Sequence, residues 1–147
     1  MEKIQGSAFR SAMDFKSAFH QLVLTEESMP VTAFYANNVL YEYTRLPFGH
    51  VLAMNAYCML MAVLCAGYEP SSYYADDLMI TTKSDPKKTR EILFDEHLKH
   101  LKGMLERIIH AGLKLVANKC QWFYGPDKPL DWLGFTLQNN LLRPQES

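Results

Sequence analysis

The sequence lacks the features of a membrane or secreted protein. Its longest apolar stretch, residues 51–66, is too short to cross a bilayer and contains the polar Asn55, and the N-terminus has no apolar signal core. The three cysteines form neither a CxxC pair nor a metal-ligand spacing. We therefore expect an intracellular protein, cytoplasmic or nuclear, with reduced thiols and no membrane partner. Repeats, low-complexity tracts and linkers are also missing, so the 147 residues predict one compact domain spanning 1–147.

The chain also has little net charge, −1, and so carries no overall basic signature for nucleic acid. Its charges are unevenly distributed, however. Residues 1–82 hold four Lys and Arg against eight Asp and Glu, whereas residues 83–119 hold nine against five. This asymmetry is consistent with a metal site beside a phosphate-facing surface, and equally with a lysine-rich helix face in water. An apolar share of 48% excludes a disordered chain.

Local patterns predict a mixed α+β fold. Two helices on one face of a small antiparallel sheet would account for the order of elements. Asn37-Asn38 is a hairpin signal because Asn tolerates left-handed dihedral angles. The expected elements are a strand at 9–15, a helical turn followed by an extended piece at 16–24, a hairpin at 30–46, a buried helix at 51–66, a hairpin at 71–82, a helix at 86–111, and strands at 113–116, 120–124 and 130–137.

The clearest predicted helix is 86–111. Pro86 suits its first turn and Gly112 lies just past its end. Its histidines, His97 and His100, are spaced i, i+3 and could bind a metal together with other ligands. No further ligands lie nearby in the sequence, so we expect surface histidines. The expected buried stripe has spacings of 4, 3, 4 and 3 and consists of Phe94, Leu98, Leu101, Leu105 and Ile108.

Three acidic residues stand out among sixteen. Asp14 follows an apolar strand, and Asp76 and Asp77 lie inside an apolar, β-prone run. Adjacent strand residues face opposite sides of a sheet, so one acid of the pair would face the core unless "ADD" forms a turn. If the two strands pair, the three carboxylates converge and repel one another unless cations neutralise them. The alternative is that the three acids are ordinary turn and loop residues.

Five motifs in order resemble the palm of reverse transcriptases of gypsy-type LTR retrotransposons and retroviruses, from residue 1 to about 137. The resemblance implies a ferredoxin-like palm of an RNA-directed DNA polymerase that uses two Mg²⁺ ions, with Mn²⁺ as an alternative. It also implies an RNA template, a DNA primer and dNTPs as partners. The motifs are AMDFKSAFHQ around Asp14, RLPFG at 45–49, YYADD at 73–77, HAGLKLVANKC at 110–120 and WLGF at 132–135.

The resemblance also implies roles for individual residues. Asp14, Asp76 and Asp77 match the catalytic metal ligands, with the carbonyl of Phe15 as a further ligand. Phe19 matches an aromatic gate against the ribose 2′-hydroxyl, for which core packing is the alternative. Gln21 and Lys119 match nucleotide-binding positions, and Lys119 would protonate the pyrophosphate, although a surface lysine is equally consistent. Template or primer contacts are implied for Arg45, Pro47, Phe48, Gly49, Tyr74, Trp132, Leu133 and Gly134.

The sequence also departs from the family pattern. After PFG the family usually continues with Asn-Ala-Pro and a Phe-Gln pair. Here the aligned residues are Leu52, Ala53 and Met54, then Tyr57 and Cys58, so the Asn, Pro and Gln are lost. The resemblance further implies that fingers, thumb and RNase H are absent, so a protein partner could replace fingers and thumb. An alternative function is a non-polymerising palm, derived from a retroelement, that binds protein or RNA through its sheet or its basic helix. A generic ferredoxin-like RNA-binding domain would leave the three acids unexplained.

Overall fold

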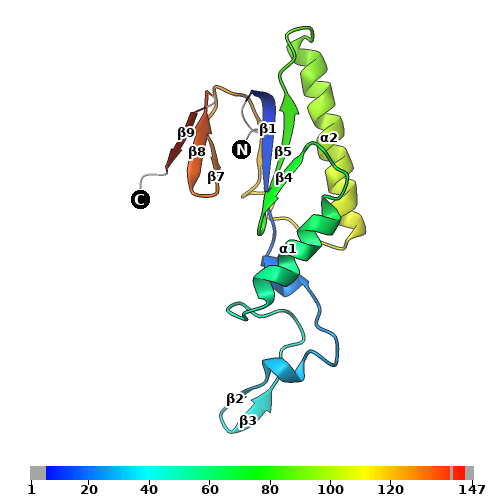
Figure 1. Cartoon of the computed structure of the whole chain (residues 1–147), viewed down its shortest axis with the longest axis vertical. Coiled ribbons are helices and arrows are strands. Elements are labelled where there is room, and N and C mark those ends of the chain that lie inside the picture. Colours follow the sequence, from blue (N-terminus) through cyan, green and yellow to red (C-terminus); the bar gives the residue numbers. More distant parts are fainter. Residues whose placement is uncertain (1–5, 140, 145–147) are drawn as a thin grey trace.

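The structure, a computed structural model, describes residues 6–139 and 141–144. Its centre is a four-stranded antiparallel sheet with the strand order β4-β5-β1-β6. Helices α1 and α2 connect these strands and pack on one face of the sheet (Figure 1). The arrangement confirms the predicted α+β fold. The bounds are β1 Ser7–Asp14, α1 Ala53–Leu64, β4 Ser71–Tyr74, β5 Asp77–Lys83, α2 Arg90–His110 and β6 Gln121–Tyr124.

Two smaller sheets complete the molecule. The hairpin of β2 (Phe34–Ala36) and β3 (Val39–Tyr41) extends away from the central sheet (Figure 1). Its turn is Asn37-Asn38, with φ angles of 51° and 59°, so the predicted hairpin is confirmed. The second sheet is formed by β7 (Leu130–Trp132), β8 (Phe135–Gln138) and β9 (Leu141–Pro144). Short 3-10 helices at Ala18–Gln21 and Pro30–Thr32 complete the elements.

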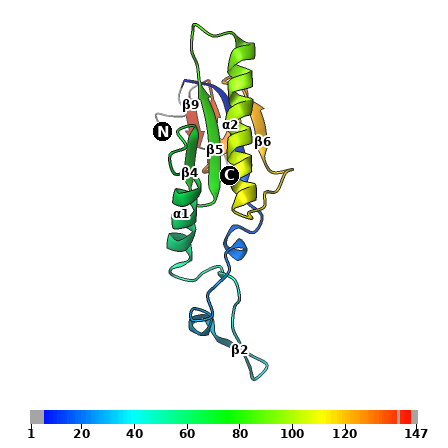
Figure 2. The same ribbon diagram turned by 90° about the vertical axis from the view of Figure 1, so that its right-hand side faces the viewer.

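Strand alternation gives the central sheet two buried faces. Met13 and Leu78 point toward the helices and join the larger core cluster. Ala12 and Met79 point to the opposite face, where they pack against Leu130 of β7 and the sheet to which it belongs. Figures 1 and 2 show α2 on one side of the central sheet and β7–β9 on the other. The second layer was not expected from the sequence, because it depends on the long-range packing of a short hairpin.

Helix α2 begins later than predicted. The hydroxyl of Thr89 accepts a hydrogen bond from the Ile92 N–H and caps the helix, so Pro86 lies before its first turn. Gly112, with φ +71°, ends it as predicted. The predicted buried stripe is wrong at Phe94 and Leu98, which are 41% and 50% exposed. The buried residues are Leu93, His97, Leu101, Met104 and Ile108.

The expectation of surface histidines is wrong for His97, which is fully buried. Its Nε2 lies 2.8 Å from the Ser11 hydroxyl and its Nδ1 lies 2.9 Å from the Thr82 hydroxyl. A buried polar side chain is tolerated when its hydrogen bonds are made, so a histidine can occupy the apolar stripe. His100 is half-buried and its Nδ1 lies 2.9 Å from the same Thr82 hydroxyl.

Two further expectations are corrected. Helix α1 is buried along one face only, because Met59 and Val63 are 71% and 75% exposed. The predicted strand at 113–116 is reduced to a single bridge between Phe15 and Leu115, since turns at 111–112 and 117–119 leave too few residues for a ladder. Within the described ranges, neither helix is both long and apolar enough to cross a membrane.

Candidate active site

Asp14, Asp76 and Asp77 lie at the same end of the central sheet. The antiparallel register of β1 and β5 places Asp14 directly opposite Asp77. The same register pairs Ala12 with Met79, so both acids lie on the β7–β9 face. Ala75 and Asp76 form a two-residue turn between β4 and β5, with a φ of 50° at Ala75. The expected turn is therefore confirmed for Asp76, whereas Asp77 is already the first residue of β5.

In the metal-free protein, burial and mutual repulsion disfavour the ionised forms of these acids. Burial raises the pKa of the half-buried Asp77, and the negative charges of Asp76 and Asp14 raise this pKa further. No side chain or backbone group in the described part of the chain donates a hydrogen bond to any of the three carboxylates. Such a cluster favours a bound cation, and its oxygen donors are those that Mg²⁺ prefers. Nonetheless, residues 6–139 and 141–144 contain no group of three His, Cys, Asp or Glu already arranged to hold a metal.

The backbone carbonyl and the backbone N–H of Asp14 both make hydrogen bonds within the fold. Its carbonyl accepts a hydrogen bond from the Val116 N–H, and its N–H donates to Cys120 Sγ at 3.4 Å. Phe15 pairs with Leu115 without hydrogen bonds of its own to that residue, so its carbonyl points away from the segment that contains Leu115. No signal in the sequence indicated the contact of Cys120 with Asp14.

A cavity of about 270 Å³ joins several predicted site residues. Asp14 and Asp77 line it together with Lys119 and the β7–β8 turn of Trp132, Leu133 and Gly134. Leu133 and Gly134 both have positive φ, 54° and 73°, as a tight two-residue hairpin turn requires. The structure thus brings two of the metal-ligand candidates, one nucleotide candidate and the three candidates of the primer turn into one cavity, whereas Asp76 and Phe15 do not line it.

The cavity also contains a third acid, Asp131, which the sequence did not single out. Thr136 donates a hydrogen bond to its carboxylate at 2.7 Å. The side-chain amide of Gln121 pairs with the backbone of Asp131, donating to its carbonyl and accepting from its N–H, and so ties β6 to β7. Only the folded structure could reveal this acid, because Asp131 lies far along the chain from the other three.

Phe19, another nucleotide-site candidate, belongs to an aromatic cluster that packs against the larger core. The ring of Phe19 lies 5.2 Å from those of Phe48 and Tyr57, and Tyr57 also contacts Phe15. Phe19 is only partly buried against the core, so its ring retains an open side. Gln21, by contrast, uses its side-chain amide within the fold: it donates to the carbonyls of Lys16 and Lys114 and accepts the Lys114 N–H.

The template-side candidates lie next to this cluster. Arg45 donates to the carbonyls of His20 and Gln21, while Pro47 is buried and Phe48 is 60% exposed. Gly49 has φ +80°, a conformation that explains why glycine stands there. Tyr74, at the end of β4, is 67% exposed.

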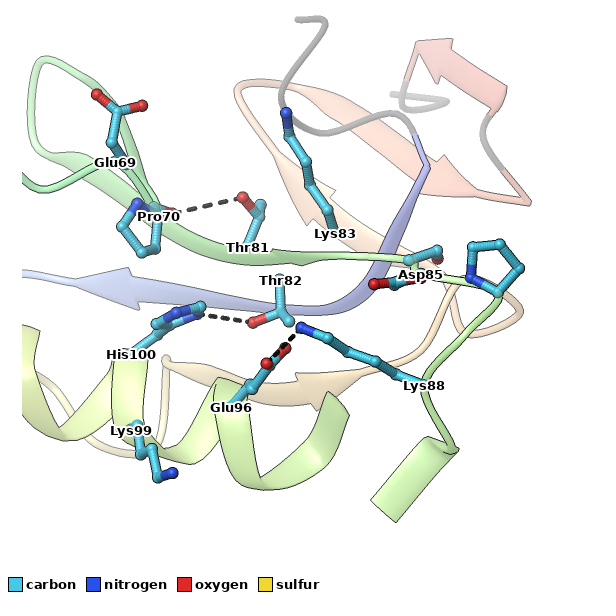
Figure 3. A pocket seen from close by; sticks show the side chains of 12 residues that line it. Glu69, Pro70, Thr81, Thr82, Lys83, Asp85, Lys88, Glu96, Lys99 and His100 are labelled. Carbon is cyan, nitrogen blue, oxygen red and sulfur yellow. Dashed lines mark hydrogen bonds and ion pairs between the residues drawn. The ribbon is translucent and has the colours of Figure 1, made fainter. Parts of the chain in front are cut away.

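A second, larger cavity of about 640 Å³ lies at the opposite end of β5 (Figure 3). Thr81, Thr82 and Lys83 line one side of it, and Lys88 pairs with Glu96 across 2.5 Å. Burial lowers the pKa of His97 behind this cavity to about 4, which keeps the ring neutral. Its hydrogen bonds to Ser11 and Thr82 are therefore those of an uncharged ring that stabilises the fold.

Known proteins are similar to this chain in both sequence and fold. A sequence profile described as "Reverse transcriptase (RNA-dependent DNA polymerase)" matches residues 1–137. The chain is 32% identical over 125 residues to the retrovirus-related Pol polyprotein from transposon 412 of Drosophila melanogaster, covering 84% of this chain and 9% of the polyprotein. It is 35% identical over 142 residues to the enzymatic polyprotein of Cestrum yellow leaf curling virus, covering 95% of this chain and 20% of that protein.

Solved structures match at the level of the fold. A foamy viral protease-reverse transcriptase in complex with double-stranded DNA has a TM-score of 0.79 at 22% identity, over 95% of this chain and 22% of the viral chain. The same viral protein in complex with an RNA/DNA hybrid also has a TM-score of 0.79, at 21% identity, over 97% of this chain and 18% of that one. This chain therefore spans less than a quarter of the length of each of these proteins.

Proposed function

Because the chain belongs to the reverse transcriptase (RNA-dependent DNA polymerase) family, we propose that it is the palm of an RNA-directed DNA polymerase. The observation that carries this proposal is the pairing of Asp14 with Asp77 beside Asp76, at a cavity shared with Lys119 and the Trp132 turn. We propose these three acids as the catalytic metal ligands. Their partners would be an RNA template, a DNA primer and dNTPs.

The donor set fits Mg²⁺ because it consists of carboxylates that accept no hydrogen bond from the described residues, and the carbonyl of Phe15 would be a further oxygen ligand. Two Mg²⁺ ions bound there, or Mn²⁺ in their place, would activate the attacking oxygen and stabilise the leaving oxygen of an in-line displacement. Asp14, Asp76 and Asp77 would orient the ions, and the ammonium of Lys119 would donate a proton to the departing pyrophosphate.

Other residues would select and position the substrates. The open side of the Phe19 ring would exclude a ribose 2′-hydroxyl and admit a deoxynucleotide. The turn of Trp132, Leu133 and Gly134 would contact the primer end next to the carboxylates. Template contacts would come from the exposed Phe48, Gly49 and Tyr74 and from Arg45 and Pro47. Gln21 would act indirectly, since its amide holds the backbone beside Phe19.

The alternative, a palm that binds protein or RNA without polymerising, makes a different prediction for the carboxylates. A binding module would not need Asp77 ionised beside two other acids, so Asp77→Asn would leave its ligand affinity unchanged. For a polymerase palm, the same substitution removes one charge and one donor oxygen from the metal site, and with them metal-dependent activity.

The test is primer extension on an RNA template with MgCl₂, combined with calorimetric titration of MgCl₂ into the chain. We expect Mg²⁺ binding and Mg²⁺-dependent extension in the wild type, and the loss of both in Asp76→Asn and Asp77→Asn. Asp95→Asn, an exposed acid on α2, is the matched control and should keep both. Mg²⁺ binding that is equal in the wild type and Asp77→Asn, together with no extension, would overturn the proposal.

A further inference from the structure

The hydroxyl of Tyr57 is the feature that the proposed roles leave unexplained. Tyr57 is fully buried in α1, and its hydroxyl oxygen is shielded from solvent. Within residues 6–139 and 141–144 this oxygen has no hydrogen-bond partner. Buried hydroxyls are normally paired, because the loss of their hydrogen bonds to water is otherwise not compensated. An unpaired buried hydroxyl next to a candidate active site therefore suggests that it forms its hydrogen bond only when the site is occupied.

The ring of Tyr57 packs beside two residues of the candidate site. Tyr57 packs between Phe15, the residue after Asp14, and Phe19, the candidate gate. The negative charges of Asp76 and Asp14 act on the Tyr57 hydroxyl, so both acids lie near it. A protonated hydroxyl is a hydrogen-bond donor, and carboxylates are its natural acceptors.

Asp76 is the better placed acceptor of the two. The side chains of Asp14 and Asp77 are confined by strand alternation to the β7–β9 face, opposite to the helix face on which Tyr57 packs. Asp76 belongs to the turn, so alternation does not restrict it, and its carboxylate is exposed and accepts no hydrogen bond from the described residues. Its charge also has the larger influence on Tyr57.

We propose that Tyr57 is a positioning residue whose hydroxyl donates a hydrogen bond to the Asp76 carboxylate when a divalent cation occupies the site. The donated bond orients the carboxylate and holds one of its oxygens, leaving the other for the cation. Metal-binding carboxylates are commonly held by such outer hydrogen bonds, and the loss of one lowers metal affinity 10- to 100-fold. This inference rests on the proposed function, because it requires a cation at Asp14, Asp76 and Asp77.

The test measures Mn²⁺ binding by electron paramagnetic resonance, with MgCl₂ as competitor, in the wild type and Tyr57→Phe. The matched control is Tyr68→Phe, because the Tyr68 hydroxyl already donates to the His100 carbonyl at 2.7 Å on another part of the fold. We expect Tyr57→Phe to weaken Mn²⁺ binding by 10- to 100-fold and Tyr68→Phe to leave it unchanged. In Asp76→Asn, the further change Tyr57→Phe should alter affinity less than about twofold, because the two side chains act as one unit.

Urea unfolding without metal provides a second readout. Tyr57→Phe removes an unpaired oxygen, so its unfolding midpoint should equal or exceed that of the wild type, whereas Tyr68→Phe removes a made hydrogen bond and should lower it. A lower midpoint in Tyr57→Phe, or Mn²⁺ affinity equal to wild type, would overturn the role of Tyr57 and leave the proposed function intact. If wild type binds Mn²⁺ no more tightly than Asp77→Asn, the proposed function fails, and this inference fails with it.

Discussion

Removal of the charge of Asp77 should stabilise the metal-free protein. Asp14 and Asp77 are directly opposed across β1 and β5, and like charges in this position destabilise an antiparallel pair by up to about 1 kcal/mol. Partial burial and the nearby Asp76 act in the same direction. Asp77→Asn keeps the size and shape of the side chain. We therefore expect the free energy of unfolding to rise by about 1 kcal/mol at neutral pH, and the melting temperature by about 2–4 °C.

The pH dependence of this gain follows from the direction of the pKa shift. The folded pKa of Asp77 is raised above its unfolded value of about 3.9, so the folded state holds its proton more tightly. The stability linked to that proton is fully present below the unfolded pKa and is lost as pH rises through the folded pKa. The advantage of Asp77→Asn should therefore be smallest below about pH 4 and should grow toward neutral pH.

Urea unfolding followed by tryptophan fluorescence measures both effects, with Asp95→Asn on the exposed face of α2 as the control that should stay within about 0.5 kcal/mol of wild type. Saturating MgCl₂ should reverse the order, because a ligand at a hundred times its Kd stabilises the folded state by about 2.7 kcal/mol and Asp77→Asn lacks part of the site. A metal-free Asp77→Asn that is less stable than wild type at neutral pH would refute the repulsion argument.

Three further predictions concern the stability of the fold, each measured by chemical or thermal denaturation. Burial lowers the pKa of His97 to about 4, below its unfolded value of about 6.5. The stability that the neutral His97 ring contributes is therefore fully present above pH 6.5, and about 3 kcal/mol of it is lost as pH falls to 4. His97→Gln should flatten this pH dependence of the free energy of unfolding, and the exposed His110→Gln should not. Arg10→Met should cost about 2–4 kcal/mol, because the fully buried guanidinium donates to the carbonyls of Gly125 and Pro126, whereas the exposed Arg143→Met should cost little. Leu133→Asn should raise the free energy of unfolding by about 1 kcal/mol, since Leu133 holds φ +54°; no gain would show that the turn is unstrained.

The parts of the fold that sequence reasoning predicted correctly depend on local signals. Asn37-Asn38 adopts the left-handed angles that its hairpin needs, and Gly112 ends α2. The turn at Ala75-Asp76 follows from a small polar interruption between two apolar runs, and it brings Asp77 opposite Asp14 as soon as the strands pair. Local signals were therefore enough to locate both the central hairpin and the three acids.

The errors involve residues whose environment is made by distant parts of the chain. His97 is buried because Ser11 and Thr82 satisfy its ring, and Ser11 lies 86 positions away in the sequence. Cys120 and Asp131 reach the site only through the return of β6 and β7 to the end of β1. Neither their type nor their spacing from Asp14 distinguishes them in the sequence, so no local pattern could have indicated them.

The two ends of β5 differ in a way that supports a functional origin for the carboxylate cluster. Toward the Lys83 end the buried ring of His97 is paired with Ser11 and Thr82, whereas the Nε of the buried Arg10 has no partner among the described residues. At the Asp77 end, three acids and the Tyr57 hydroxyl have no partner among the described residues. Of the three buried side-chain nitrogen and oxygen atoms without a partner among the described residues, two therefore belong to residues near the Asp77 end, Tyr57 and Trp132. Such a local exception to polar pairing is expected where a ligand supplies the missing partner.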